Sequence, residues 1–350
     1  MHIRNNAKEL TLGVDTHLEK HVTVLIDNIG QVVDTKEIAV TSIGYSTMYK
    51  LCSSFGNVKQ AGIEGTGTYG AGLCKYLQDQ GVAVFEVNRP NRARRRLRGK
   101  SDPTDAENAA RSVLAKESTA IPKSHDGTVE ALRFLMVARK SSVKSKTQTI
   151  NQIRALLVTA PEKIREKCYV PSSYQCVKAC EELEAEPNNL VESSLISVVQ
   201  LLAKRWQLLA AELRDIDKQL KILTKAKAPT LIEQYGVGTY VAATLLVTAG
   251  DNPDRLKNES SFAALCGVSP LEASSGKTQR HRLNRGGARD ANNALWTVTL
   301  IRMRNDARTK KYVDKRVTEG KSTKEIQRCL KRYIARELFP IMVSDLSCLT

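Results

Sequence analysis

The feature that most constrains the fold is a heptad repeat of apolar residues in the middle of the chain. Apolar side chains recur there in alternating steps of four and three, at Leu195, Val199, Leu202, Trp206, Leu209, Leu213, Ile216, Leu220 and Leu223. Such steps average 3.5 residues, which keeps one seam of a helix facing a partner helix. The pattern predicts a long helix in a coiled coil.

A looser seam precedes this repeat. Its apolar positions are Val129, Leu132, Met136, Val143, Ile150, Ile153 and Leu157, while Arg139 and Lys146 occupy two further seam positions. An acidic, proline-bearing connection around residues 181–192 separates the two seams. We expect two long antiparallel helices that act as a spacer arm or a dimerisation device. An ordinary helical domain with no partner chain is the alternative.

The residues before the seams alternate between strand and helix patterns. Apolar runs at 10–14, 22–26 and 32–40 predict three strands, with a turn at 27–30. The following patterns predict a helix at 45–55, a strand ending at 61–63, a helix at 69–80, a strand at 82–87 and a helix at 102–115. Three strands followed by alternating helices and strands is the order of a ribonuclease-H-like α/β domain.

The residues after the seams are mainly helical in pattern. Residues 231–238 contain a Gly-apolar-Gly turn before an apolar helix at 240–248, as in helix-hairpin-helix modules that offer backbone N–H groups to phosphates, although a ligand-free connection has the same pattern. Residues 302–337 hold 13 Lys or Arg against 5 Asp or Glu in helical sequence ending at Pro340, which favours a nucleic-acid face. We expect domains at 1–122, 123–228 and 229–350.

The net charge of the chain indicates which class of partner it binds. The chain has 54 Lys and Arg against 37 Asp and Glu, a formal net charge of +17, so a polyanion is expected: nucleic acid first, an anionic membrane surface second. The longest uncharged stretch, 234–250, is shorter than the roughly 20 apolar residues that span a bilayer, and the first residues lack a secretory pattern. Eight scattered cysteines suggest reduced thiols. We expect a cytoplasmic location and no membrane.

Four carboxylates suggest a metal site. Asp15 and Glu64 each follow an apolar strand, and adjacent parallel strands would bring them together, while Asp102 and Asp105 share one face of a helix start. Either of these last two residues would also serve as a helix N-cap. Converging carboxylates repel unless cations lie among them, and such oxygen ligands suit Mg²⁺ or Mn²⁺. Two such ions support phosphodiester chemistry.

Two basic segments accompany these acids. Residues 89–100 hold seven basic residues in twelve and no acid; Arg92, Arg94, Arg95, Arg96, Arg98 and Lys100 are candidate contacts to a phosphate backbone, although such a run is usually a solvated loop. In the second segment Ser275 precedes Gly276 and is a candidate nucleophile, although most Ser-Gly pairs are turns. The basic residues near it, which would orient a phosphate, are Lys277, Arg280, Arg282 and Arg285.

These motifs resemble those of the DEDD-type transposases of bacterial insertion sequences, a family that includes the pilin-gene DNA invertases. The matching motifs, in the family's order and spacing, are GVDTH at 13–17, EGTGTY at 64–69, KSDPTDA at 100–106, CGVSP at 266–270, SSGK at 274–277 and RLNRGG at 282–287. Glu-Gly-Thr-Gly stands where the family commonly has Glu-Ala-Thr-Gly, and Lys-Ser-Asp where it has Lys-Thr-Asp. Neither departure changes a carboxylate.

The resemblance implies a RuvC-like N-terminal domain in which Asp15, Glu64, Asp102 and Asp105 bind Mg²⁺. It also implies a C-terminal transposase domain with a nucleophilic serine, which falls on Ser275, with Ser274 as the alternative. A coiled coil would link the domains, and the active site would be shared between subunits of a dimer or tetramer. The family further implies a structured non-coding guide RNA, the bridge RNA, that pairs with donor and target DNA.

The sequence therefore leads to the hypothesis of an insertion-sequence transposase, a DNA recombinase that cuts and rejoins DNA through Ser275 and a Mg²⁺ site. One rival is a nuclease of the Holliday-junction-resolvase kind, which has the same acids but water as its nucleophile. A second rival is a non-catalytic nucleic-acid-binding protein whose acids only cap helices.

Overall fold

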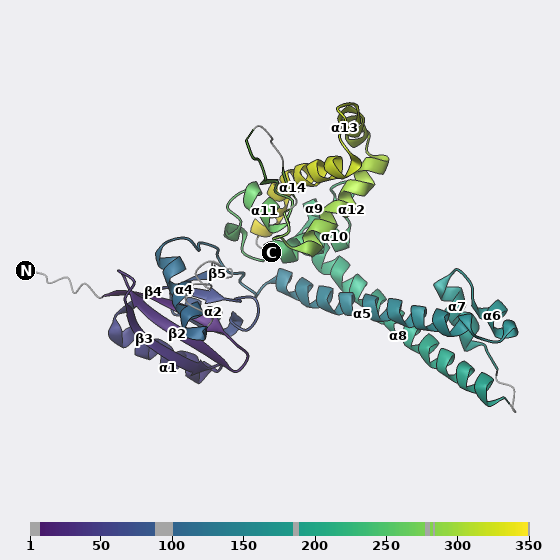
Figure 1. Cartoon of the computed structure of the whole chain (residues 1–350), viewed down its shortest axis with the longest axis horizontal. Coiled ribbons are helices and arrows are strands. Elements are labelled where there is room, and N and C mark those ends of the chain that lie inside the picture. The colour runs from purple at the N-terminus through teal and green to yellow at the C-terminus, as the bar shows by residue number, and fades with distance from the viewer. Residues whose placement is uncertain (1–7, 88–100, 185–188, 277–280, 283, 349–350) are drawn as a thin grey trace, which may run out of the picture. The chain divides into compact units, whose positions relative to one another are not determined.

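The computed structural model describes residues 8–87, 101–184, 189–276, 281–282 and 284–348. Its contacts divide the chain into two compact units (Figure 1). The first unit is Met1–His125 together with Asn252–Lys257, and the second is Asp126–Asp251 together with Asn258–Thr350. The division into three domains at 122 and 228 stays a prediction.

The first unit is built on one mixed sheet of five strands in the order β3-β2-β1-β4-β5. β1 runs antiparallel to β2 and parallel to β4. The elements are β1 (Glu9–Thr16), β2 (Lys20–Asp27), β3 (Val32–Ala39), α1 (Ser42–Phe55), β4 (Asn57–Glu64), α2 (Ala71–Asp79), β5 (Ala83–Val87) and α4 (Asp102–Leu114). This order and pairing confirm the predicted ribonuclease-H-like α/β domain.

Helices cover both faces of this sheet. Because successive side chains on a strand point to opposite faces, Leu12 and Val14 of β1 pack into the core cluster that includes residues of α1 and α2. On the other face Val22, Val24 and Ile26 of β2 pack against the alanines of α4. Two covered faces explain why β1 and β2 are buried along almost their whole length, including polar residues such as Thr11 and Thr23.

The second unit contains the two predicted long helices, α5 (Thr128–Val158) and α8 (Leu190–Lys227). Arg139 Nε lies 2.7 Å from Asp217 Oδ1, and Lys146 Nζ lies 4.3 Å from the centre of the Trp206 ring. Since the partner numbers fall as those on α5 rise, the pair is antiparallel, as expected. The two predicted seam cations thus carry polar and cation–π contacts between the helices.

The buried stripe of α8 differs from the predicted seam. Leu195, Leu202 and Leu209 are half-buried, whereas Ile196, Ala203 and Ala210 are buried. The buried stripe is thus shifted by one residue, and its two alanines belong to the same core cluster as Ile150 and Ile153 of α5. Val199, Trp206, Leu213, Ile216 and Leu220 are buried as predicted.

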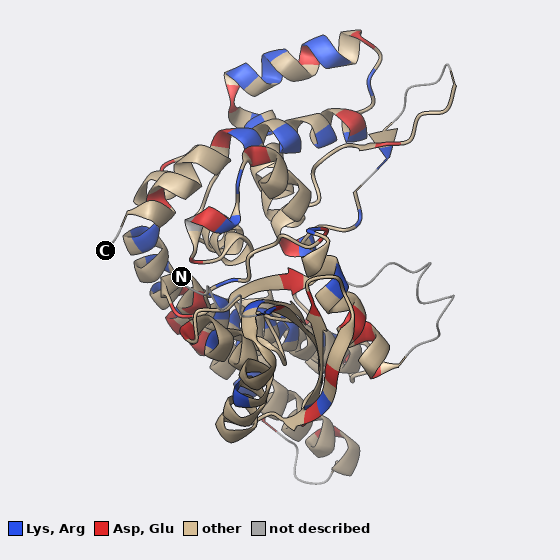
Figure 2. Ribbon diagram, turned by 90° about the vertical axis from the view of Figure 1, so that its left-hand side faces the viewer, with Lys and Arg blue, Asp and Glu red and all other residues tan. Residues whose placement is uncertain are grey.

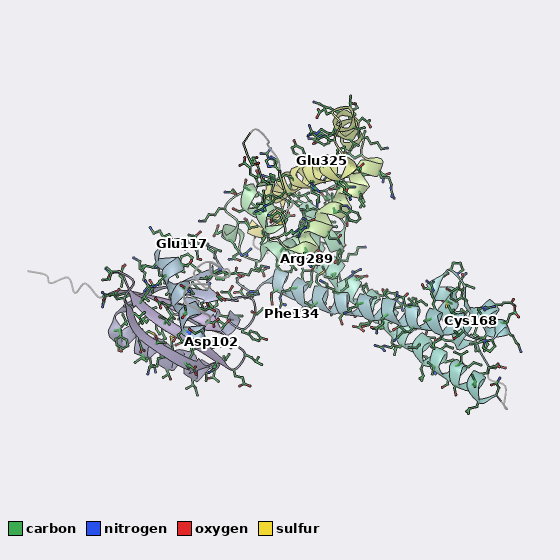
Figure 3. All side chains as sticks on the ribbon, viewed as in Figure 1. Asp102, Glu117, Phe134, Cys168, Arg289 and Glu325 are labelled. Carbon is green, nitrogen blue, oxygen red and sulfur yellow. The ribbon has the colours of Figure 1, made fainter. Side chains whose placement is uncertain are left out.

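The described part of the connection between the two long helices contains two short helices. They are α6 (Glu162–Cys168) and α7 (Ser173–Glu181), which pack at one end of the α5–α8 pair (Figures 1 and 3). Their core contains the fully buried thiols of Cys168, Cys176 and Cys180. All eight cysteines are free in this structure, and their reduced state stays a prediction.

The rest of the second unit is mainly helical. Its elements are α9 (Pro229–Ile232), α10 (Thr239–Ala249), α11 (Glu259–Leu265), β6 (Leu271–Glu272), β7 (His281–Arg282), α12 (Arg289–Asn305), α13 (Ala307–Thr318) and α14 (Thr323–Ser347), while the 3-10 turn Pro253–Arg255 belongs to the first unit. The helix before the Gly-apolar-Gly turn has only four residues, and the helix-hairpin-helix interpretation stays a prediction.

The basic C-terminal stretch covers the last turn of α12, all of α13 and the first part of α14. Figure 2 shows Lys and Arg along α13, the uppermost helix of that view. The predicted end at Pro340 is wrong, because α14 continues through the proline to Ser347. Met342 and Leu346 beyond it are buried, and the Asp345 carboxylate accepts a 2.8 Å hydrogen bond from the backbone N–H of Leu231. These contacts offset the hydrogen bond that a proline removes.

Within the described part of the chain, no helix combines the length and the apolar character that a membrane crossing would need.

Candidate active site

Two of the predicted acids end adjacent parallel strands. Val14 of β1 pairs with Ile63 of β4, so the next residues, Asp15 and Glu64, lie at the ends of neighbouring strands. Just beyond Asp15, the Thr16 hydroxyl donates a 3.0 Å hydrogen bond to the backbone carbonyl of Glu64. The alternation of the strands directs Asp15 and Glu64 to the face covered by α4. The two carboxylates therefore share one edge and one face of the sheet.

Two glycines allow α4 to lie directly on these strands. A Cβ atom on Gly13 would lie 2.0 Å from the carbonyl oxygen of Ala106, and one on Gly62 would lie 2.6 Å from that of Ala109. Gly13 and Gly62 are paired across β1 and β4, so together they form a flat seat for the helix backbone. This close approach sets the position of the first turn of α4, which carries Asp102 and Asp105.

The structure does not place either aspartate at the N-cap of α4. Ser101 holds that position with an extended backbone, and Asp102 is the first helical residue. Asp105 is 2% exposed and its backbone N–H donates to the Ser101 carbonyl at 3.0 Å. Asp105 therefore lies inside the first turn of the helix and is not its cap.

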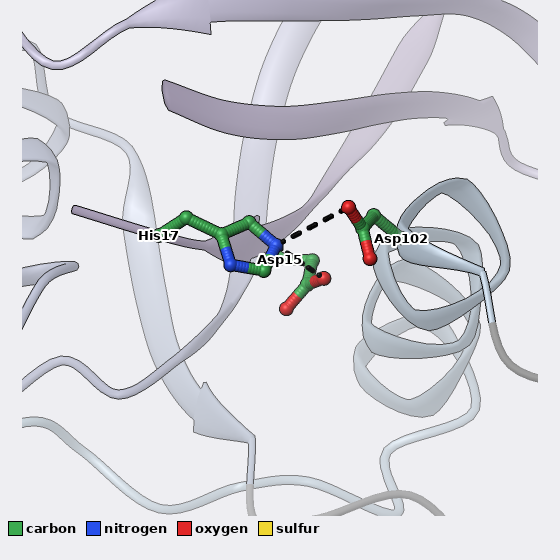
Figure 4. A group of neighbouring side chains, drawn as sticks. All are labelled: Asp15, His17 and Asp102. Atoms are coloured by element: carbon green, nitrogen blue, oxygen red, sulfur yellow. Dashed lines mark ion pairs between the residues drawn. The ribbon is translucent and has the colours of Figure 1, made fainter. Parts of the chain in front are cut away.

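His17 joins two of the acids. Its Nε2 atom lies 3.2 Å from Asp15 Oδ2 and 3.4 Å from Asp102 Oδ2 (Figure 4). One ligand atom from each of the three residues lies within 4.8 Å of the others, which is the spacing of a metal site; Glu64 and Asp105 fall outside that group. Sequence reasoning missed His17, whose only signal was its place two residues after Asp15.

The electrostatics of this group favour a cation. Burial raises the pKa of the Asp15 carboxyl, His17 lowers it, and the nearby carboxylates of Asp102 and Asp105 raise it further, with a net rise. Like-charged oxygens gathered at a half-buried point gain from a divalent cation among them. The donor set consists of carboxylate oxygens and one imidazole nitrogen. Because most of these donors are hard oxygen ligands, the set fits Mg²⁺ or Mn²⁺.

A second histidine supports the turn that carries His17. The backbone N–H of His17 donates to His21 Nδ1 at 3.4 Å, and the His21 ring stacks parallel to Tyr45 with centroids 6.0 Å apart. His21 is fully buried and its Nε2 has no hydrogen-bond partner among the described residues. Burial lowers the pKa of His21, so the ring is neutral and can accept the hydrogen bond.

The serine motif lies in the second unit, on the hairpin between β6 and β7. Among the described residues, two pairs join these strands, Leu271 with Arg282 and Glu272 with His281. Ser275 is exposed, and Gly276 beside it has a φ of +54° with no atom near its missing Cβ. The hairpin therefore presents an open serine at a turn.

The base of this hairpin is tightly packed. A Cβ on Gly287 would lie 2.1 Å from the backbone nitrogen of Gly267, so two backbones touch there. The N–H of Ala288 donates to the Leu265 carbonyl at 2.7 Å. The motif glycines thus anchor the two ends of an exposed loop.

Several predicted nucleic-acid contacts fall outside the described residues, namely Arg92, Arg94, Arg95, Arg96, Arg98, Lys100, Lys277 and Arg280. Arg282 and Arg285 are described and exposed.

The fold and the acidic cluster define a ribonuclease-H-like domain with a candidate cation site at the ends of its central strands. Two family models match the chain: a transposase model named for the DEDD motif and IS110 over residues 12–160, and the IS116/IS110/IS902 transposase family over residues 228–314. The chain belongs to the DEDD-type transposases of the IS110 family, which confirms the resemblance.

One curated relative also matches. It is the uncharacterized 43.6 kDa protein of insertion element IS110 from Streptomyces coelicolor, 28% identical over 148 residues. The match covers 41% of this chain and 36% of the relative, so the chain spans about a third of that relative's length.

Proposed function

We propose that the protein is a transposase that cuts and rejoins DNA with Ser275 as nucleophile and a divalent-cation site at Asp15, Glu64, Asp102 and Asp105. The observation that carries the proposal is the cluster that Asp15, His17 and Asp102 form at the ends of the central strands, in a chain of the IS110 family. The exposed Ser275 in the second family segment supports the nucleophile.

In the proposed reaction the Ser275 oxygen bonds to phosphorus as the bond to one deoxyribose oxygen breaks. The serine proton ends on that leaving oxygen, and the hydroxyl of another DNA strand reverses the exchange to rejoin the chain. A bound Mg²⁺ or Mn²⁺ would polarise the phosphate and offset its charge. Asp15 and Asp102 would hold it, with Glu64 and Asp105 beside them, while exposed Arg282 and Arg285 orient the DNA backbone.

We also propose that a structured guide RNA and self-association belong to this activity. The net charge of +17 supports a nucleic-acid assembly. The α8 helix leaves Leu201, Leu208 and Ile222 exposed, at 65%, 72% and 67%. These residues repeat at multiples of seven on the surface turned away from its buried stripe, which is the spacing of a second helix contact. A second copy of the chain is the proposed partner.

A denaturing gel tests the nucleophile. Protein is incubated with Mg²⁺, DNA spanning the joined ends of the element, and RNA from its non-coding flank, and covalent protein–DNA species are sought. We expect an adduct in the wild type and in Ser274→Ala, and none in Ser275→Ala or Asp15→Asn. An adduct that survives in Ser275→Ala but not in Ser274→Ala moves the nucleophile to Ser274.

The same gel tests the rival nuclease. The acidic cluster lies wholly within the first unit whereas Ser275 lies in the second, so a water-dependent cleavage by the first unit alone is the competing reaction. Cleavage without an adduct, retained in Ser275→Ala, would establish it. Omitting the RNA tests the guide: an undiminished adduct without RNA contradicts that part of the proposal.

A further inference from the structure

A basic groove in the second unit lies beside the serine hairpin. It has a volume of about 720 Å³ and is bounded by the turn at 267–270, by β7 and by one face of α14. The cationic residues that line it are Arg282, Arg316, Lys321, Arg328, Lys331 and Arg332. Glu325, at the start of α14 (Figure 3), is the acidic residue of its lining.

Carboxylates compensate only part of this charge. Arg316 pairs with Glu319, and Arg332 with Glu259. The Glu325 carboxylate accepts hydrogen bonds of 2.9 and 2.7 Å from the backbone and hydroxyl of Ser322, as the capping box of α14. Among the described residues, Arg282, Lys321, Arg328 and Lys331 have no carboxylate within 4.0 Å. The groove therefore has more cationic groups than paired acids.

Lys331 is the unusual member of this set. Its residue is 9% exposed, and its ammonium donates a 2.7 Å hydrogen bond to Asn292 Oδ1. Burial lowers the pKa of Lys331, and the neighbouring Arg328 lowers it further. A buried ammonium with a neutral amide partner costs stability, and an anion in the groove would recover that cost.

The amide that Lys331 contacts also holds the hairpin base. Asn292 Nδ2 donates to the carbonyls of Cys266 and Gly267, at 3.2 and 2.9 Å. Gly267 is the residue that packs against Gly287 at the two ends of the hairpin segment. A contact at Lys331 is thus connected, through one side chain, to the backbone that anchors the serine hairpin.

We propose that this groove binds a backbone phosphate of nucleic acid, with Lys331 and Arg328 of α14 and Arg282 of β7 as its ligands. The inference rests on the proposed function for the identity of the polymer. Guanidinium groups match phosphate oxygens in pairs, and a buried ammonium adds a point charge. The groove would thereby fix the nucleic acid relative to the serine hairpin.

Binding of a short fluorescent duplex DNA, measured by anisotropy over a range of salt concentrations in EDTA, tests this site. We expect Lys331→Met to weaken binding about tenfold and to lower the slope of log affinity against log salt by about 1, the value for one lost phosphate contact. Lys324→Met is the matched control, because Lys324 is exposed on the same helix and does not line the groove. It should change affinity less than twofold.

Thermal unfolding separates this role from a structural one. Lys331→Met should unfold at the wild-type temperature or above it, because it removes a buried charge without a carboxylate partner. A lower unfolding temperature with unchanged affinity and slope would overturn the proposal. If Lys331→Met does not fold, the exposed Arg328→Gln must show the loss of affinity and slope, and wild-type binding by that variant is equally contradictory.

The EDTA condition keeps this test apart from the proposed catalysis. The proposed adduct needs a divalent cation, so binding measured in EDTA reports on the groove without any contribution from the covalent reaction. If no covalent adduct is found but Lys331→Met still weakens duplex binding, the proposed reaction is wrong and the groove remains a binding site.

Discussion

The acidic cluster and the serine hairpin are built in opposite ways. Asp15 of the cluster is 9% exposed, at the point where β1, β4 and α4 meet backbone to backbone. Ser275 is exposed on a loop whose strands have two residues each. Asp15 is thus held by the core of its unit, whereas Ser275 lies on an exposed loop that is anchored by tight packing at its base.

The largest expected difference between the two regions is the loss of stability on replacing a glycine by alanine. Gly13→Ala places a Cβ 2.0 Å from a backbone oxygen of α4, so either the helix or the strand must move, at a cost of about 3 kcal/mol or more. The Cβ of Gly276→Ala meets no atom, so the variant should lose only the about 1 kcal/mol that a left-handed backbone costs an alanine. Urea unfolding monitored by circular dichroism measures both.

Mg²⁺ binding gives these two variants a second readout. Gly13→Ala should lose it, because α4 carries Asp102, while Gly276→Ala should keep it. Equal stability losses in the two variants would show that the close packing of α4 does not define the acidic cluster.

Removing the Asp15 charge should change the unfolding temperature less than these glycine substitutions do. The sign of the change relative to the wild type should depend on whether metal is present. Without metal, Asp15→Asn should raise the unfolding temperature by a few degrees, because burial and neighbouring carboxylates disfavour the Asp15 charge. With Mg²⁺, the wild type should gain stability and the variant should not. Ser275→Ala should change neither value, and a wild-type Mg²⁺ response in Asp15→Asn would exclude Asp15 as a ligand.

The smallest effect is expected in the pH dependence of stability. Burial lowers the pKa of His21, so the unfolded chain binds a proton more readily than the folded one. This contribution is complete above the unfolded histidine pKa of about 6.5 and is lost as pH falls through that value towards the folded pKa. In His21→Phe the decline between neutral and mildly acidic pH should be smaller.

Urea unfolding at several pH values measures this decline. His281→Phe, on the exposed β7 strand, is the control and should keep the wild-type curve. A His21→Phe curve that falls as steeply as the wild type would place the titrating group elsewhere.

Much of the first unit was predictable because its physics is local. Apolar runs identified β1 and β2, and the end of a buried strand identified Asp15 and Glu64 as residues of one sheet edge. His17 was not predictable in the same way. Its role depends on how the turn after β1 brings its ring between Asp15 and Asp102, which no periodicity records.

The helices also show which features can be predicted from sequence and which depend on tertiary packing. The repeat in α8 predicted a long helix and its antiparallel partner, but Ala203 and Ala210, not Leu202 and Leu209, are buried. Hydrophobicity alone ranks leucine first, whereas the way the helix packs in its core decides which residues are buried. The continuation of α14 past Pro340 likewise depends on the tertiary bond from Leu231 to Asp345.

The segment Asn252–Lys257 affects how the protein is made. It belongs to the first unit, where Asn252 and Arg255 donate to the carbonyls of Pro122 and Ile121 at 2.8 and 3.0 Å. During synthesis the sheet emerges early, yet this last piece of its unit follows only after α5, α8 and α10 have been translated. The first unit is therefore finished late by a distant part of the chain, and its completion is linked to synthesis of the long helices.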